Sequence, residues 1–231
     1  MWIETIADSA QQQAEKLAQA VAEELRAAIE NRGRACIAVS GGKSPIEFFD
    51  YLSQESLDWS KVLVTLVDER WVAADSGESN EKLVREHLLK NNSEVAYFLP
   101  LKNSAETPAE GIMDCETQLR EQIDQLDVVI LGMGLDGHTA SWFSASSSLD
   151  ELASINTSAW CLPVEDEVLD FPRMSLTWGL MHQANQIFLS FSGEDKYQVF
   201  LMANEISDRN ELPISHVLQG SDKTIQVYCS K

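Results

Sequence analysis

An aspartate and a histidine separated by one glycine, Asp136-Gly137-His138, come soon after an apolar run that predicts a buried strand over 127–131. Gly134 and its neighbouring glycine let the backbone turn sharply and approach a ligand closely. Because ligands bind at the carboxyl ends of strands in parallel α/β sheets, this turn is a candidate site for general acid–base chemistry. The alternative is a strand-to-helix turn in which the aspartate caps a helix and the histidine only packs.

A glycine-rich turn, Ser40-Gly41-Gly42-Lys43-Ser44-Pro45, lies between a predicted strand at 35–39 and a predicted helix at 45–52. Glycines leave backbone N–H groups free to face an anion, and the helix dipole favours negative charge at this end. The glycine spacing matches neither a Walker loop nor a dinucleotide fingerprint. The turn is therefore a candidate phosphate site, with an ordinary tight turn capped by serine as the alternative.

Further charged side chains stand at the ends of other predicted elements. Asp68-Glu69-Arg70 directly follows a predicted strand at 61–67, where the arginine is suited to bind a phosphate with two hydrogen bonds. The alternative for these three residues is a surface salt-bridge cluster. Arg173 and Lys196 each offer one more cation, and a lysine at a helix start is poorly placed unless an anion is nearby. The remaining histidines, His87, His182 and His216, are assigned to structure or surface.

Composition limits the classes of partner. The chain has 231 residues with 17 basic and 37 acidic side chains, a formal charge of −20, which argues against nucleic acid and anionic membranes as partners. Any anionic small molecule therefore needs a local cluster of cations. Four scattered cysteines indicate neither a metal site nor a disulfide framework, and they fit a reducing compartment. With no apolar run long enough to span a bilayer and no signal peptide at the N-terminus, we expect a cytoplasmic protein.

The elements that position these residues alternate between strand and helix, which predicts one α/β domain over 1–231 with a mostly parallel, Rossmann-like sheet covered by helices on both faces. Predicted strands lie at 35–39, 61–67, 95–99, 127–131, 160–164, 186–192 and 224–229. Predicted helices lie at 9–31, 45–52, 83–89, 109–123, 194–206 and, as a single turn, 213–218. Residues 144–156 are expected to form a loop or short helix, and 174–184 is apolar without clear periodicity.

Taken together, the motifs occur in the order seen in 6-phosphogluconolactonases, and the resemblance spans roughly residues 5 to 220. It rests on Val39–Gly42, Asp68–Val72, Ser79-Asn80, Leu131–Ser141, Pro172–Ser175 and Gly193–Lys196. The related glucosamine-6-phosphate deaminases share the Ser-Gly-Gly and Asp-Gly-His segments. Those enzymes typically carry a catalytic Glu within Asn-Glu-Pro, where this chain has Trp142-Phe143-Ser144, and an aromatic residue where it has Arg70. Both differences favour the lactonase.

Three departures from the lactonase pattern stand out. Phe143 is followed by Ser144-Ala145 rather than Pro-Gly, Lys43 occupies a variable position, and the tail at 222–231 matches only loosely. The departure after Phe143 affects the expected shape of the local loop. The variable position of Lys43 affects whether this lysine is expected to contact phosphate.

The resemblance implies hydrolysis of 6-phospho-D-glucono-1,5-lactone to 6-phosphogluconate in the oxidative pentose phosphate pathway, without cofactor or metal. His138 is the expected base, since an imidazole titrates near pH 6.5, and Asp136 either orients it or caps a helix. The expected phosphate and substrate contacts are Ser40, Gly41, Gly42, Lys43, Asp68, Arg70, Gly134, Arg173 and Lys196. The alternatives are an aminosugar-phosphate isomerase/deaminase and a non-catalytic sugar-phosphate sensor. The sequence does not indicate an oligomeric state.

Overall fold

A seven-stranded parallel sheet forms the centre of the computed structural model, which describes residues 1–167 and 169–231. The strand order is β1-β10-β9-β6-β2-β3-β5, and every neighbouring pair runs parallel. The strands are β1 (Trp2–Ala7), β2 (Ala35–Val39), β3 (Val62–Leu66), β5 (Tyr97–Phe98), β6 (Val128–Leu131), β9 (Gln186–Ser192) and β10 (Ile225–Ser230). The central strands β2 and β6 are buried along their whole length, as expected for strands covered on both faces. The predicted parallel α/β fold is confirmed.

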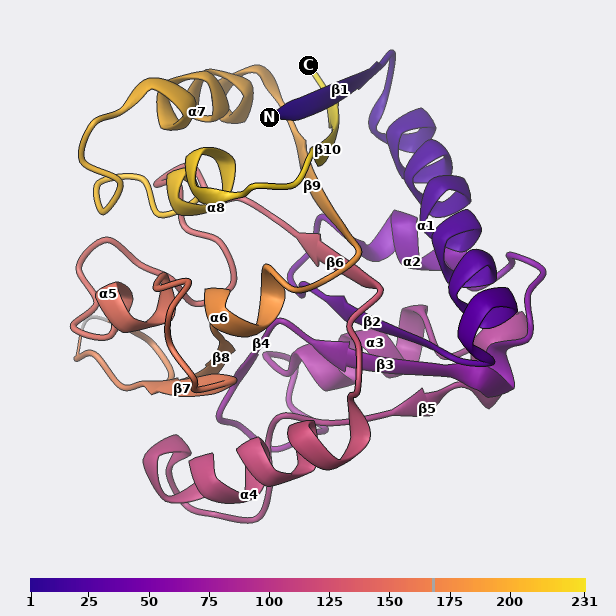
Figure 1. The fold of residues 1–231 in the computed structure, drawn as a ribbon, viewed down its shortest axis with the longest axis horizontal. Helices are drawn as coiled ribbons and strands as arrows, with labels where there is room; N and C mark the ends of the chain where they lie inside the picture. The colour runs from indigo at the N-terminus through magenta and orange to yellow at the C-terminus, as the bar shows by residue number, and fades with distance from the viewer. Residues whose placement is uncertain (168) are drawn as a thin grey trace.

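Helices cover both faces of this sheet: α1 and α2 lie on one side, and α6, α7 and α8 on the other (Figure 1). The helices are α1 (Ala10–Arg32), α2 (Ile46–Leu52), α3 (Asn80–His87), α4 (Pro108–Gln122), α5 (Leu149–Leu152), α6 (Trp178–Met181), α7 (Glu194–Glu205) and α8 (Ser215–Gly220), with 3₁₀ turns at Trp59–Lys61 and Asn91–Val95. The longest helix begins where the Ser9 hydroxyl accepts the N–H of Gln12, and it ends at Gly33 with φ of 78°. No helix within the described ranges is both long and apolar enough to cross a membrane.

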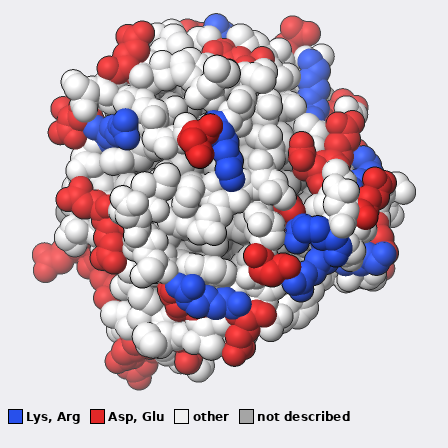
Figure 2. Space-filling model, viewed as in Figure 1, with Lys and Arg blue, Asp and Glu red and all other residues white. Residues whose placement is uncertain are grey.

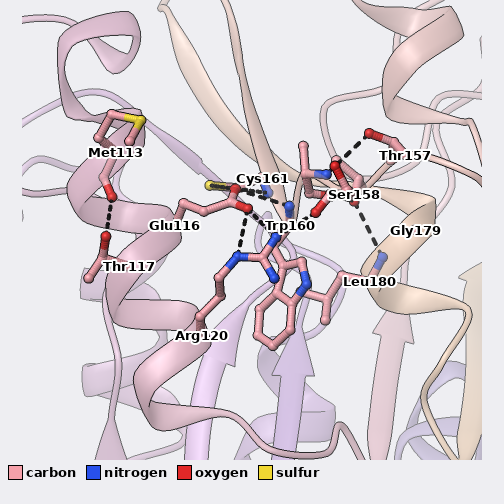
Figure 3. Close-up of polar contacts among 12 residues, drawn as sticks. Met113, Glu116, Thr117, Arg120, Thr157, Ser158, Trp160, Cys161, Gly179 and Leu180 are labelled. Atoms are coloured by element: carbon pink, nitrogen blue, oxygen red, sulfur yellow. Dashed lines mark hydrogen bonds and ion pairs between the residues drawn. The ribbon is translucent and has the colours of Figure 1, made fainter.

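A second, three-stranded antiparallel sheet lies beside the main one, in the order β4-β8-β7. Its strands are β4 (Asp68–Arg70), β7 (Cys161–Val164) and β8 (Arg173–Leu176). Figure 3 shows how α4 is tied to the start of β7. The Glu116 carboxylate accepts the backbone N–H of Trp160 at 3.0 Å, and the Arg120 guanidinium lies 4.7 Å from the centre of the Trp160 ring. The small sheet is thereby fixed in position at the edge of the fold.

Two strands of the main sheet differ from the sequence-based expectations. The first strand, β1, was not expected, because it is an edge strand that pairs only with β10 and leaves Ile3 and Ile6 about half exposed, so its sequence lacks a buried apolar run. The predicted strand at 95–99 is reduced to the two residues of β5, preceded by a 3₁₀ turn. Both departures occur at the edges of the main sheet, where burial constrains the sequence least.

The strand order reverses direction between β2 and β6. From β2 the chain proceeds to β3 and β5 on one side, and from β6 it proceeds to β9 and β10 on the other. β2 and β6 are nonetheless hydrogen-bonded neighbours, with Val39 paired to Ile130. In open parallel sheets the crevice at such a reversal, beyond the carboxyl ends of the strands, is where ligands bind. The two motifs singled out from the sequence follow these two strands.

Candidate active site

Ser40 joins the ends of the two central strands. Its backbone N–H and its hydroxyl both donate to the carbonyl of Ile130, at 3.1 and 2.9 Å, and the hydroxyl oxygen accepts the N–H of Gly132 at 3.1 Å. The next two residues turn the chain away, with Gly42 at φ of 88°. Within the described chain the N–H groups of Gly41 and Gly42 make no hydrogen bond. They remain available to an anion.

The loop after β6 is held by its own backbone. The Thr139 hydroxyl donates to the carbonyl of Gly132 at 2.8 Å, and the N–H of Gly134 donates to the carbonyl of His138 at 2.9 Å. Gly137 has φ of 72°, which favours glycine. The alternative in which Asp136 caps a helix does not hold, because no helix begins directly after the histidine: Thr139 pairs with Trp142 in an isolated bridge, and the next helix is α5. A tight reversal interrupts residues with ordinary helix propensity.

His138 and Asp136 form a close pair at the edge of the cleft. Nδ1 of the imidazole lies 2.6 Å from Oδ1 of the carboxylate, which also accepts the backbone N–H of His138 at 3.2 Å. The hydrogen bond from His138 holds the pKa of Asp136 below its usual range, with burial opposing the effect. Because no helix begins here, Asp136 is not a helix cap, and its partner is the histidine. The imidazole is about one-third exposed.

The Asp68-Glu69-Arg70 motif forms a strand of its own rather than the end of the preceding one. In β4, Arg70 stands directly opposite Arg173 of β8, and Asp68 opposite Ser175. Like charges opposite each other on antiparallel strands repel. Burial lowers the pKa of Arg173, an effect that Asp68 opposes and Arg70 reinforces. The register therefore concentrates positive charge at one end of the cleft. An anion bound there would reduce the repulsion between the two arginines.

Asp68 is buried and contacts the histidine loop, β8 and α3. Its Oδ2 accepts the Ser141 hydroxyl at 2.6 Å and lies 3.7 Å from Nη1 of Arg173. Its backbone carbonyl accepts the side-chain amide of Asn80 at 2.8 Å. The carboxylate thus joins the histidine loop to the small sheet, and it does so largely out of contact with solvent.

Asn80 takes part in the site although sequence reasoning gave it no role. Its Oδ1 accepts Nη1 of Arg70 at 2.9 Å, and it lines the cleft. The helix α3 that carries it is anchored by buried Glu69, which accepts the N–H groups of Arg70, Asn80 and Glu81, each at 2.8 Å. Burial raises the pKa of Glu69 in spite of these donors. The signal present in the sequence was Ser79-Asn80, where the serine begins the helix.

Lys196 enters the cleft from the first turn of α7. Burial lowers the pKa of its ammonium group, and Asp136 opposes that shift. The lysine is half-buried and lines the cleft together with His138. A desolvated lysine at a helix start is stabilised when an anion binds beside it.

These elements surround a cleft of about 860 Å³, counted out to its open mouth. Nine predicted site residues line it: Ser40, Gly41, Gly42, Asp68, Arg70, Gly134, His138, Arg173 and Lys196. Asp136 stands behind the histidine, and the exposed Lys43 is not among the lining residues. An apolar wall that sequence reasoning missed is formed by Leu17, Pro45, Phe48 and Met133. The sequence carries no signal for this wall, because the apolar residues that form it cannot be distinguished in the sequence from apolar residues of the core.

The cationic cleft contrasts with the general surface. On the face shown in Figure 2, acidic side chains are spread around the rim, with basic side chains standing beside several of them. In a chain with a formal charge of −20, two arginines and a lysine grouped in one cleft indicate a local site for an anion. No group of three or more His, Cys, Asp and Glu side chains in the described ranges is arranged to hold a metal ion.

The remaining histidines have local partners outside the cleft. His87 lies 3.2 Å from Asp50, His182 contacts the carbonyl of Trp178, and His216 contacts Asn210. The four cysteines are free and buried.

Comparison with known proteins agrees with this architecture. The family model described as glucosamine-6-phosphate isomerases/6-phosphogluconolactonase matches residues 8–226. The 6-phosphogluconolactonase of Rhizobium meliloti is 40% identical over 93% of each chain, and that of Neisseria meningitidis serogroup A is 39% identical over 96% of each chain. The crystal structure of a 6-phosphogluconolactonase from Shewanella baltica superposes with a TM-score of 0.96 at 38% identity, covering 100% of this chain and 98% of that one.

Proposed function

This chain belongs to the glucosamine-6-phosphate isomerase/6-phosphogluconolactonase family as a lactone hydrolase, and we propose that His138 is the base with which it hydrolyses 6-phospho-D-glucono-1,5-lactone. The observation that carries the proposal is the 2.6 Å pair of His138 and Asp136 beside a cationic cleft. The reaction belongs to the oxidative pentose phosphate pathway. Free, buried cysteines support a reducing, cytoplasmic setting.

The lactone is an activated ester, so a base and an activated water suffice for its hydrolysis. An ionised Asp136 only accepts hydrogen bonds, so Nδ1 of His138 carries its proton toward the carboxylate. The lone pair of the neutral ring is then on Nε2. That nitrogen is the group that accepts a proton from water.

The steps balance without a further reactant. Water adds its oxygen to the lactone carbonyl carbon while Nε2 of His138 takes its proton, giving a tetrahedral oxyanion. Collapse of that intermediate restores the carbonyl and breaks the bond to the ring oxygen, which receives the proton from the imidazolium. The products are the open-chain acid, which ionises to 6-phosphogluconate, and the neutral imidazole.

The phosphate of the substrate lies some distance from the lactone carbonyl along the sugar. The group suited to bind it is the cross-strand pair of Arg70 and Arg173, together with the N–H groups of Gly41 and Gly42. Lys196 adds a third cation to the cleft. The repulsion between the two arginines is relieved when a dianion lies between them.

The function is tested by assaying the purified protein on 6-phosphogluconolactone and on glucosamine 6-phosphate in parallel. We expect acid release from the lactone above its spontaneous rate and no ammonia from the aminosugar. Ammonia release would show an isomerase/deaminase instead, and binding of either compound without turnover would show a sensor.

A further inference from the structure

One aromatic ring touches both the base and a cation of the cleft. The Phe143 ring centre lies 4.9 Å from that of the His138 imidazole, with the planes inclined at 37°. The guanidinium carbon of Arg173 lies 5.2 Å from the same ring centre. Phe143 does not itself line the cleft, so the ring stands behind the two groups that do.

Both partners of the ring have little else to hold them. Nε of Arg173 is buried without a hydrogen-bond partner among the described residues, and its ion pair with Asp68, at 3.7 Å, is longer than a hydrogen bond. The imidazole of His138 is held at Nδ1 by Asp136, which is itself more than half exposed. The hydrogen bond constrains the ring at one edge, and the contact with Phe143 constrains the plane of the ring.

Phe143 is in turn fixed by its neighbour in the chain. Trp142 is completely buried, its indole N–H donates to the carbonyl of Leu176 at 3.0 Å, and its ring packs edge-on against Trp178. The backbone carbonyl of Phe143 accepts the N–H of Ser146 at 3.0 Å. The Phe143 ring is therefore attached to a part of the loop that is held by packing and hydrogen bonds. A rigid support is what a precisely placed catalytic group requires.

We propose that Phe143 is a positioning residue that sets the distance and orientation of His138 relative to Arg173 through its contacts with both. The inference rests on the proposed function, because it assigns the imidazole to the reacting carbonyl and the guanidinium to the anionic end of the substrate. Aromatic faces attract guanidinium groups and stack with imidazole rings, so one ring serves both purposes. The charged groups near Arg173 are Asp68, Glu69 and Arg70 on β4, and Asp170. Asp136 pairs with His138 on the same loop, and Lys196 of α7 lies near Asp136.

The kinetic test replaces Phe143 by leucine, which keeps bulk and removes the aromatic face. We expect kcat to fall and KM for the phosphorylated lactone to rise, each by roughly three- to tenfold, the range of a partly desolvated aromatic–cation contact. Combined with Arg173→Ala, the substitution is expected to cause no further rise in KM. Combined with His138→Ala, it is expected to cause no further fall in kcat.

The matched control is Phe98→Leu. Phe98 also carries a guanidinium on its ring, that of Arg85 at 4.8 Å, but it lies in β5 away from the cleft. We expect the wild-type kcat and KM from this variant. Phe143→Met, which fills similar space flexibly, replaces the leucine variant if that variant does not fold.

A second readout needs no turnover. In the proton NMR spectrum, stacking on Phe143 shifts the ring resonances of His138 upfield, and Phe143→Leu should remove that shift while Phe98→Leu preserves it. Equal losses from Phe143→Leu in the Arg173→Ala, His138→Ala and wild-type backgrounds, or an unchanged His138 resonance, would overturn the inference. If the wild-type protein did not hydrolyse the lactone, the proposed function would fail. The NMR shift, with the affinity for inorganic phosphate, would then decide the positioning role separately.

Discussion

Oδ1 of Asp136 accepts hydrogen bonds from both the backbone N–H and the Nδ1–H of His138, at 3.2 and 2.6 Å. A single carboxylate oxygen therefore binds both the loop backbone and one edge of the histidine ring. Since the pKa of Asp136 is held below its usual range by this histidine, the carboxylate stays ionised throughout the neutral range and loses its charge only as the pH falls through that lowered pKa. The hydrogen-bonded pair of Asp136 and His138 is therefore formed at the neutral pH at which we expect the reaction to run.

Replacing Asp136 with asparagine should lower kcat and leave KM nearly unchanged. The amide either accepts or donates, so the proton of the neutral ring is no longer confined to Nδ1. We expect about a tenfold loss of kcat, the low end of the range for a charge-assisted hydrogen bond, because the carboxylate is more than half exposed. Asp50→Asn, which alters the similar pair with His87, is the matched control. A variant with wild-type kcat would reduce Asp136 to a loop-forming role.

His138→Ala should lower kcat/KM by about 10²–10⁴-fold, the usual contribution of a general base. The measurement is the rate of lactone hydrolysis, corrected for the appreciable spontaneous rate. His87→Ala is the control, since His87 is paired with an aspartate outside the cleft. A loss smaller than about tenfold would rule out His138 as the base.

Arg173→Ala should separate phosphate binding from chemistry. We expect KM for the phosphorylated lactone to rise by roughly 10- to 100-fold, the value of a lost charged hydrogen bond, with little change for unphosphorylated gluconolactone. Arg85→Ala, which also removes an ion pair and a cation–aromatic contact, serves as the control. Equal effects on the two substrates would refute the assignment of Arg173 to the phosphate.

Lys196 predicts a pH dependence of anion binding. Because burial lowers its pKa, the ammonium group loses its proton at a lower pH than a free lysine, and affinity falls as the pH rises through that value. The phosphate is already a dianion there, so its own ionisation adds no such change. Calorimetric titration with 6-phosphogluconate between pH 7 and about 10.4, the ordinary lysine value, should show the loss. Lys196→Arg should abolish it and Lys102→Arg should not, and persistence in Lys196→Arg would refute the assignment.

Gly41→Ala tests the contact between the first turn and α3. A Cβ at this position would lie 1.9 Å from Oδ1 of Asn80, the atom that accepts Arg70, so the asparagine must move. We expect about 1–3 kcal/mol lower stability in urea denaturation, as for other overpacked sites, together with a raised KM. Gly77→Ala, where an added Cβ meets nothing within 4 Å, should change neither property. Wild-type KM in Gly41→Ala would contradict the role given to Asn80.

The sequence by itself determined the parallel α/β fold, because buried central strands such as β2 and β6 are continuously apolar and helices such as α1 carry an apolar stripe with caps at both ends. It also located the two turns at the reversal of strand order, since glycines and polar residues directly after apolar strands are a local signal. These features depend on neighbours within a few residues along the chain. The edge strand β1 lacks a continuous apolar run of this kind, so the sequence did not predict it.

Only the tertiary structure decided which distant residues meet. Arg70 stands opposite Arg173 through the register of a small antiparallel sheet, and Asp68 receives the hydroxyl of Ser141, 73 positions along the chain. It also decided that Asp136 faces the histidine rather than capping a helix, because the chain reverses instead of continuing as a helix. Cross-strand register and loop reversal arise from packing among distant segments, which no local pattern in the sequence encodes.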